Sequence, residues 1–206
     1  MVTYCLIRQE KIFSDEKMFT VDWKPNRRND RYICSNINEV PVAMKVKHPA
    51  GVMVLGAVSS DGHVMPPHLF GPGEKVTADV YLLALEHKVK PRIERVTGGA
   101  DYVFRQDSAP AHTAKKTQEW CQQNLHMVWT KDMWPPNSPD LNPMDFYVWG
   151  AVQANVNDRP LVGRVALQEK ISRVMGEMKH EVVARACGRF RPRLEGIIKA
   201  GGGYTE

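Results

Sequence analysis

Cysteine is scarce in this sequence and is never paired at short spacing. The four cysteines, Cys5, Cys34, Cys121 and Cys187, lie far apart without a C-x-x-C pair, which argues against a disulfide framework or a cysteine zinc site. No apolar run approaches the roughly 20 residues that span a bilayer. Residues 1–20 are too charged for a secretory signal peptide. These absences predict a cytosolic or nuclear protein with no membrane partner.

Internal repeats are absent too, which argues against a solenoid. With 206 residues, 43% hydrophobic and 25% charged, the chain fits a single globular domain with a substantial core. Its 28 Lys and Arg against 23 Asp and Glu give a net charge of +5. This mild excess favours polyanionic partners such as nucleic acid but leaves other enzymes open.

The hydrophobic pattern predicts an α/β fold. Strands come first, and helices and strands then alternate, which is typical of a mixed sheet with an initial antiparallel meander and a later parallel part. The predicted strands are residues 11–23, a hairpin in 51–70 turning at Asp61 and Gly62, 102–106 and 126–130. The first predicted helix starts at Thr77 and ends or kinks at Pro91. Further helices are predicted over 112–124, about 143–157, about 165–183 and a shorter stretch near the C-terminus. A loop or arm is predicted at about 24–50.

Asp107 is the first candidate for a functional carboxylate. It follows the strand predicted at 102–106, and functional groups of open α/β sheets gather beyond the carboxyl ends of strands. The alternative is a local role, because Asp often opens a turn or caps a helix.

Asp15 is the second candidate. In an extended strand Phe13, Asp15 and Phe19 share one face, and a carboxylate on a largely apolar face is costly unless its desolvation is offset. A divalent cation could offset it. An ion pair with Lys17 on the same face is the structural alternative.

Asp145 is the third candidate, at the start of the helix predicted from about 143. Asn142 suits the N-cap and Pro143 the first helical position, so Asp145 could simply favour the helix start. Asp140, five residues earlier, competes for any functional role.

Four segments in order, "FSDEKMF", "NRRNDR", "FRQDSAPAHTA" and "WPPNSPDLNPMDFYVWG", resemble the catalytic core of mariner-superfamily transposases. The likeness covers about residues 11–190, and several motifs matching in order are far more specific than one short pattern. The resemblance implies a ribonuclease-H-like sheet, with three antiparallel strands and then parallel ones, flanked by helices. It implies a single catalytic domain over 1–206 with a helical part at about 143–198.

The same resemblance assigns Asp15, Asp107 and Asp145 as catalytic ligands of two Mg²⁺ or Mn²⁺ ions. It implies that the enzyme cuts double-stranded DNA at transposon ends and transfers the 3′-hydroxyl into target DNA, as a homodimer in a synaptic complex in the nucleus. Asp140 lies in the loop before the last ligand. Between Asp107 and Asp145 are 37 residues, more than in the best-known members. The longer gap and the third Asp resemble an Asp-Asp-Asp branch of the family.

Five further residues are weaker candidates for contacting DNA. His112 is close enough in sequence to Asp107 to touch the scissile phosphate, although a structural or helix-initiating role is favoured. Trp134 could stack on a flipped base or pack as a loop anchor. A basic cluster could grip phosphates or a partner subunit, or could be a solvated loop; it contains Arg27, Arg28 and Arg31.

The helix-turn-helix modules that precede the catalytic domain in this family have no counterpart here. We therefore expect an isolated catalytic domain with weak or no specific recognition of terminal repeats. Two other functions stay open. One is an inactive, transposon-derived DNA-binding or assembly module, and the other is a general ribonuclease-H-like nuclease.

Overall fold

The computed structural model describes residues 9–22, 33–40, 47–130, 138–158 and 161–201. A five-stranded mixed sheet lies at its centre, with strand order β3-β2-β1-β4-β5. β2 pairs antiparallel with both β1 and β3, whereas β4 pairs parallel with both β1 and β5. The strands are β1 (Glu10–Thr20), β2 (Gly51–Ser59), β3 (His68–Leu69), β4 (Tyr102–Arg105) and β5 (Met127–Val128). The predicted order of antiparallel and then parallel strands is confirmed.

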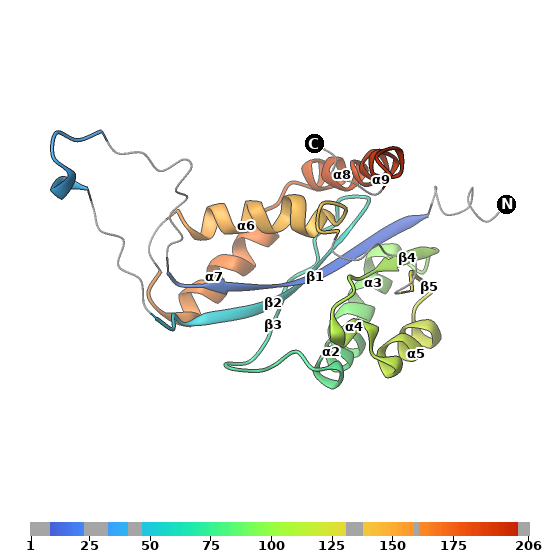
Figure 1. The fold of residues 1–206 in the computed structure, drawn as a ribbon. Helices are drawn as coiled ribbons and strands as arrows, with labels where there is room; N and C mark the ends of the chain where they lie inside the picture. The colour runs from blue at the N-terminus through green and yellow to red at the C-terminus, as the bar shows by residue number, and fades with distance from the viewer. Residues whose placement is uncertain (1–8, 23–32, 41–46, 131–137, 159–160, 202–206) are drawn as a thin grey trace.

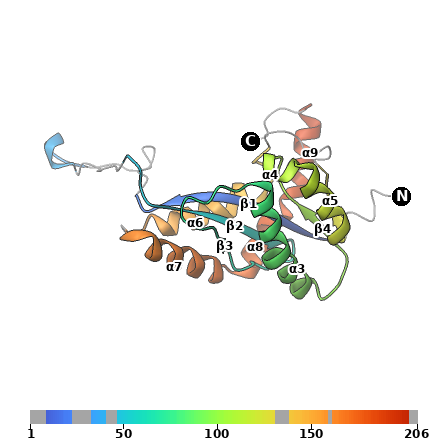
Figure 2. The ribbon, with the colours of Figure 1, turned by 90° about the horizontal axis from the view of Figure 1, so that it is seen from below.

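Helices cover both faces of the sheet, as Figures 1 and 2 show from two sides. One face carries α2 (Ala78–Ala84), the π-helical turn η2 (Leu85–Val89), α3 (Lys90–Thr97), α4 (Pro110–Thr113) and α5 (Lys115–Asn124). The other carries the π-helical turn η4 (Met144–Val148), α6 (Trp149–Val156), α7 (Gly163–Gly176), α8 (His180–Gly188) and α9 (Phe190–Lys199).

The alternation of β1 side chains divides the core in two. Ile12 faces the α2–α5 side, where it is buried with Tyr81 and Cys121. Phe13 and Phe19 face the other side, where they pack with the helices from η4 to α9. Because successive strand residues point to opposite faces, Asp15 lies on the side of η4 and α6, and Glu16 lies on the side of α2 and α4. This division decides which partners each acid meets.

Two predicted helix boundaries are corrected. The sequence predicts that Pro91 ends or kinks the helix. The helix does not end there, because helical backbone continues through Pro91 to Thr97, and an irregular turn of π-helix precedes the proline. Such a turn is a recognised way for a helix to accommodate a local disturbance. The single helix predicted over about 165–183 is two helices. Gly176 ends α7 and Lys179 is extended, which lets residues of both helices reach the same core.

The segment predicted as a loop or arm is described only in part. Residues 33–40 contain the short 3-10 turn η1 (Ile37–Glu39) with no buried residue, and they project away from the sheet in Figure 1. The basic cluster of Arg27, Arg28 and Arg31 lies outside the described residues. Within the described ranges, none of the helices combines the length and apolar character that crossing a membrane requires.

Candidate active site

One pocket gathers four carboxylates from three parts of the chain. It has a volume of about 440 Å³, and Asp15, Glu16, Asp107 and Asp145 all line it. The remaining wall comes from Ser108, Ala109, Ser138, Pro139 and Asn142. The three aspartates that the sequence singles out are therefore brought together in space, although 91 residues lie between the first two in the chain.

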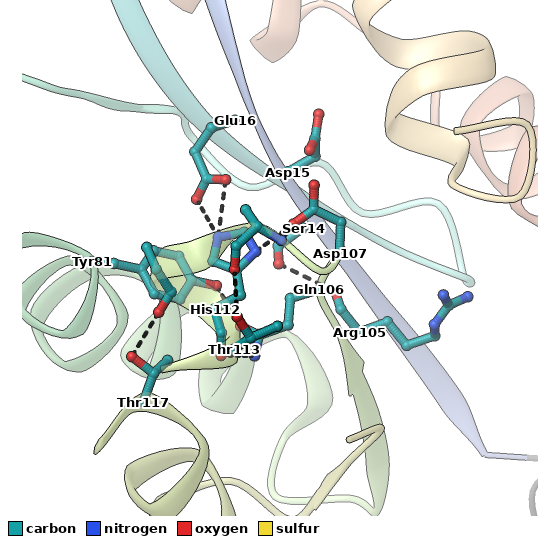
Figure 3. A network of polar contacts seen from close by, with 12 residues as sticks. Ser14, Asp15, Glu16, Tyr81, Arg105, Gln106, Asp107, His112, Thr113 and Thr117 are labelled. Carbon is teal, nitrogen blue, oxygen red and sulfur yellow. Dashed lines mark hydrogen bonds and ion pairs between the residues drawn. The ribbon is translucent and has the colours of Figure 1, made fainter. Parts of the chain in front are cut away.

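The pairing of β1 with β4 brings Asp15 and Asp107 together. The two strands run parallel with Phe13 opposite Arg105. Asp15 and Asp107 each follow that pair by two residues, so they reach the same edge of the pocket. The side-chain hydroxyl of Ser14 donates to the carbonyl of Arg105 at 3.1 Å, which ties the strands together at this point. Figure 3 shows both carboxylates beside these strands.

Asp145 enters the pocket from the first turn of the helical segment formed by η4 and α6. As predicted, Asn142 caps this start, since its Oδ1 accepts from the backbone N–H of Met144 at 3.1 Å and its carbonyl accepts from that of Asp145 at 2.9 Å. The helix-start role of Asp145 and its place in the pocket therefore coexist. Asp140 does not line the pocket.

Trp149 supplies the partner of Asp15. The indole Nε1–H donates to Asp15 Oδ2 at 2.5 Å, and Asp15 is only 7% exposed. The alternative of an ion pair between Asp15 and Lys17 is not realised, because no such contact joins these two described residues. Lys17 instead lowers the pKa of Asp145 through its charge.

Burial, together with the crowding of like charges, raises the pKa values of Asp15 and Asp145. Burial raises the pKa of Asp15 to about 8, and the charges of Asp145, Glu16 and Asp107 add to the effect while the Trp149 bond opposes it. Partial burial and the charge of Asp107 raise the pKa of Asp145 to about 6, against the pull of Lys17. The protein thus concentrates acidic groups whose ionised forms its own cations only partly compensate.

Asp107 differs from its neighbours because it has dedicated hydrogen-bond donors. Its Oδ1 accepts from the backbone N–H of Ala109 at 2.9 Å and contacts His112 Nδ1 at 2.5 Å. Burial acts to raise the pKa of Asp107, but the bond and charge of His112 outweigh it and bring the pKa below its usual value. The turn-forming role of Asp107 is real, and it leaves Oδ2 for the pocket.

His112 is placed differently from the expectation that it contacts DNA. Its side chain is 1% exposed, and its Nε2 lies 3.1 Å from Glu16 Oε2 while Nδ1 faces Asp107. Burial acts to lower the pKa of His112, yet the two carboxylates raise it to about 10. Because both ring nitrogens are engaged inside the protein, this geometry favours the structural alternative, and contact of His112 with DNA stays a prediction. Trp134 lies outside the described residues.

Sequence reasoning missed Glu16 and Trp149. Glu16 directly follows Asp15, so strand alternation sends it to the opposite face and hides its relation to the pocket. The available signal was the pair Ser14 and Glu16, two polar residues that lie between the apolar Ile12 and Met18 on the same strand face. Trp149 reads as an ordinary core residue, and only its distance from Asp15 reveals its second role.

Carboxylate oxygens are the ligands that hard divalent cations prefer. No group of three His, Cys, Asp or Glu side chains in the described residues converges tightly enough to hold one ion. Asp15, Asp107 and Asp145 nevertheless interact electrostatically in pairs across one pocket. Magnesium-type ions keep several waters and need only one or two carboxylates each, so this donor set fits cations shared between pairs of aspartates.

We expect Gly56→Ala to destabilise the protein by about 1–3 kcal/mol, the usual range for overpacking. Gly56 pairs with Asp15 across β1 and β2, and a Cβ there would lie 2.7 Å from Trp149 Cη2 and 2.7 Å from Met144 Cε. Met144 can bend away, but the rigid indole must shift, and its bond to Asp15 shifts with it. Urea unfolding measures the change in the free energy of unfolding.

Gly150→Ala is the matched control, because the added Cβ meets no atom within 4 Å and the substitution should be neutral or slightly stabilising in a helix. Equal stability of the two variants would contradict the packing argument.

Comparison with known proteins matches this chain to one family. The family model for DDE superfamily endonucleases matches residues 11–167. The Tcb2 transposase of Caenorhabditis briggsae is 38% identical over 112 residues, covering 54% of this chain and 38% of that protein. The Tc1 transposase of Caenorhabditis elegans is 25% identical over 208 residues, covering 95% of this chain and 69% of that protein.

Solved structures share the fold. The Mos1 transposase in its paired-end complex with the left transposon end superposes with a TM-score of 0.82 at 19% identity, covering 95% of this chain and 56% of that one. The catalytic domain of Mos1 mariner transposase gives a TM-score of 0.70 at 20% identity, covering 95% and 84%. These matches confirm the predicted ribonuclease-H-like fold. The chain spans little more than half of the Mos1 chain in that complex and 38% of Tcb2.

Proposed function

This chain belongs to the DDE superfamily endonucleases, and from that premise we propose that it is the catalytic domain of a transposase. It would cut the phosphodiester backbone at transposon ends and join the freed 3′-hydroxyl to target DNA. The observation that carries the proposal is the convergence of Asp15, Asp107 and Asp145 from three separate elements on one pocket. The similarity to the Tc1 and Tcb2 transposases supports the same chemistry.

The proposed cofactor is a pair of Mg²⁺ or Mn²⁺ ions. Mos1 paired-end complexes have been solved with Mn and with Mg, and the surplus of carboxylates here suits such ions. Asp15, Asp107 and Asp145 would hold them. When bound, the ions would activate the attacking oxygen and stabilise charge on the phosphate in an in-line displacement.

The chain's own contribution is to fix acceptor oxygens before DNA arrives. Trp149 holds Oδ2 of Asp15, and two donors hold Oδ1 of Asp107. Asp145 enters the same pocket from a capped helix start. Asp15 and Asp145 must lose their protons before they can serve as ligands, because their pKa values are raised. Such preorganisation avoids rearrangement during the reaction.

The proposed partners are double-stranded DNA and a second copy of the chain. The Mos1 neighbours are a paired-end complex with a transposon end and a strand transfer complex, and the positive net charge of this chain suits a polyanion. Sedimentation with and without DNA ends tests the pairing. We place the protein in the nucleus, where chromosomal targets lie, and imaging of a fluorescent fusion checks that placement.

A plasmid assay tests the proposed activity. We expect the wild-type chain to nick supercoiled plasmid in Mn²⁺ but not in EDTA, since the reaction needs cations at the aspartates. A labelled duplex with a recessed 3′-hydroxyl should also become joined to the plasmid, which gel electrophoresis detects. Cleavage confined to the RNA strand of a hybrid, without joining, would instead indicate a general nuclease. Folded protein inert on every substrate and unable to bind Mn²⁺ would identify an inactive module.

A further inference from the structure

We propose that His112 and Glu16 form a brace that positions Asp107, so that only one oxygen of Asp107 is presented to the pocket. The brace consists of the hydrogen bonds from the two ring nitrogens of His112 to the two carboxylates, seen in Figure 3. It rests on the proposed function, because it concerns how one of the proposed metal ligands is held. His112 and Glu16 are positioning residues in this scheme.

The two carboxylate oxygens of Asp107 differ in the number of hydrogen-bond donors that contact them. Oδ1 receives two contacts, from the N–H of Ala109 at 2.9 Å and from His112 Nδ1 at 2.5 Å. No contact to Oδ2 is found among the described residues. Rotating the carboxylate would break both bonds to Oδ1, so the side chain is held with Oδ2 as its available ligand atom.

The ring of His112 has little freedom to move, so it can hold Asp107 in one orientation. The side chain is 1% exposed, and the ring lies against that of Tyr81 with centroids 4.3 Å apart. On the far side, Nε2 contacts Glu16 Oε2 at 3.1 Å and Oε1 at 3.2 Å. Ionised carboxylates only accept hydrogen bonds, so the ring donates from both nitrogens.

The backbone of His112 is anchored as well. Its carbonyl accepts from the side-chain amide of Gln118 at 2.8 Å. Gln106 also approaches this carbonyl at 3.5 Å, and its Oε1 accepts from the Tyr81 hydroxyl at 2.7 Å. The short helix α4, the strand end at Gln106 and α2 therefore share one buried polar network. Residues of this kind behind metal ligands typically change metal affinity by 10–100-fold when mutated.

Glu16 lines the pocket but is turned toward His112. Its neighbour Asp15 points to the other face of β1, toward Trp149. Glu16 side-chain exposure is 11%, and both of its oxygens are within hydrogen-bonding distance of the ring. This orientation assigns it to holding the histidine, with direct metal ligation as the competing role.

Calorimetric titration of the full chain with Mn²⁺ tests the brace without relying on catalysis. We expect His112→Ala to weaken Mn²⁺ binding by about 10–100-fold. His112→Asn can still donate to Asp107 and should recover most of that loss. Glu16→Gln retains an acceptor for the ring and should weaken binding by less than about threefold, given the modest energy of one hydrogen bond. His126→Ala is the control. It removes another histidine–aspartate pair, in which both His126 and Asp101 are exposed, and should leave Mn²⁺ affinity unchanged.

Three results would overturn the brace. The first is a Mn²⁺ affinity that is unchanged in folded His112→Ala. The second is a Mn²⁺ affinity of His112→Asn that is no higher than that of His112→Ala. The third is a loss of Mn²⁺ affinity in Glu16→Gln as large as in Asp107→Asn, which would make Glu16 a ligand. If His112→Ala does not fold, the Asn and Gln variants decide the matter. Wild-type protein that binds Mn²⁺ and cuts DNA while the His112 variants behave normally refutes the brace alone. Wild-type protein that does neither refutes the proposed function, and the brace with it.

Discussion

Asp107→Asn is expected to reduce Mn²⁺-dependent DNA nicking by at least about 10³-fold, the upper end for removal of one preorganised electrostatic contact. The amide keeps the size of the carboxylate, and its oxygen can still accept from Ala109 N–H. What it loses is the negative charge that a divalent cation requires. The fold and DNA binding should therefore survive, as circular dichroism and filter binding can show.

Asp101→Asn is the matched control for this experiment. Asp101 lies just before the opposite end of β4, where it is 64% exposed and pairs with His126. The same chemical change at that position should leave nicking within about twofold of wild type, because surface pairs contribute little. Substantial nicking by Asp107→Asn, or an equal loss in both variants, would remove Asp107 from the proposed catalytic set.

Asp15→Asn is expected to stabilise the metal-free protein at pH 8 while it abolishes metal-dependent cleavage. Asp15 is 7% exposed, and burial together with neighbouring acids raises its pKa to about 8. Each tenfold increase in proton affinity corresponds to about 1.4 kcal/mol, so the native state loses up to a few kcal/mol when this proton leaves. Asparagine removes that cost and can still accept from the Trp149 indole.

The pH dependence of this effect has a definite sign. Between the ordinary Asp pKa of 3.8 and the native value of about 8, the folded state holds a proton that the unfolded state has released. Stability from this group is therefore present below about pH 4, falls as pH rises, and is fully lost above about pH 8. The advantage of Asp15→Asn should grow across the same interval and disappear near pH 4.

Thermal unfolding of the metal-free proteins at several pH values measures this difference. At pH 8 the melting temperature of Asp15→Asn should exceed that of wild type by several degrees, since about 1 kcal/mol shifts it by 2–4 °C in a domain of this size. Adding Mn²⁺ should raise the melting temperature of wild type much more than that of the variant. A variant less stable than wild type at pH 8 would show that Asp15 is already compensated in the fold. Asp101→Asn should show no pH-dependent gain.

Both experiments test the same property of the site: ionising its aspartates destabilises the folded protein until a cation binds. After burial, the charges of Asp145 and Asp107 contribute to the raised pKa of Asp15, and the charge of Asp107 contributes to the raised pKa of Asp145. A domain built only for stability would place other residues there. Stability sacrificed at a functional site in this way is common in enzymes.

Much of the site is predictable because the relevant signals are local. The extended segment around Asp15, the strand that ends before Asp107 and the cap at Asn142 all depend on short stretches of chain. Asp15 stands out because it interrupts an apolar strand face, and Asp107 because it follows a strand. The helix boundaries at Pro91 and Gly176 are harder to predict, since packing against the sheet overrides local preference there.

The sequence alone determined the identity and order of the three aspartates, the strand and helix pattern around them, and the family to which the motifs point. Only the tertiary structure decided that Trp149 rather than Lys17 meets Asp15, and that His112 is buried between Glu16 and Asp107. The reason is that the contact of Trp149 with Asp15 and the contact of His112 with Glu16 join residues that are 134 and 96 positions apart in the chain. Their distances are set by the parallel pairing of β1 with β4 and by the helices packed on each face, which no short stretch of sequence encodes.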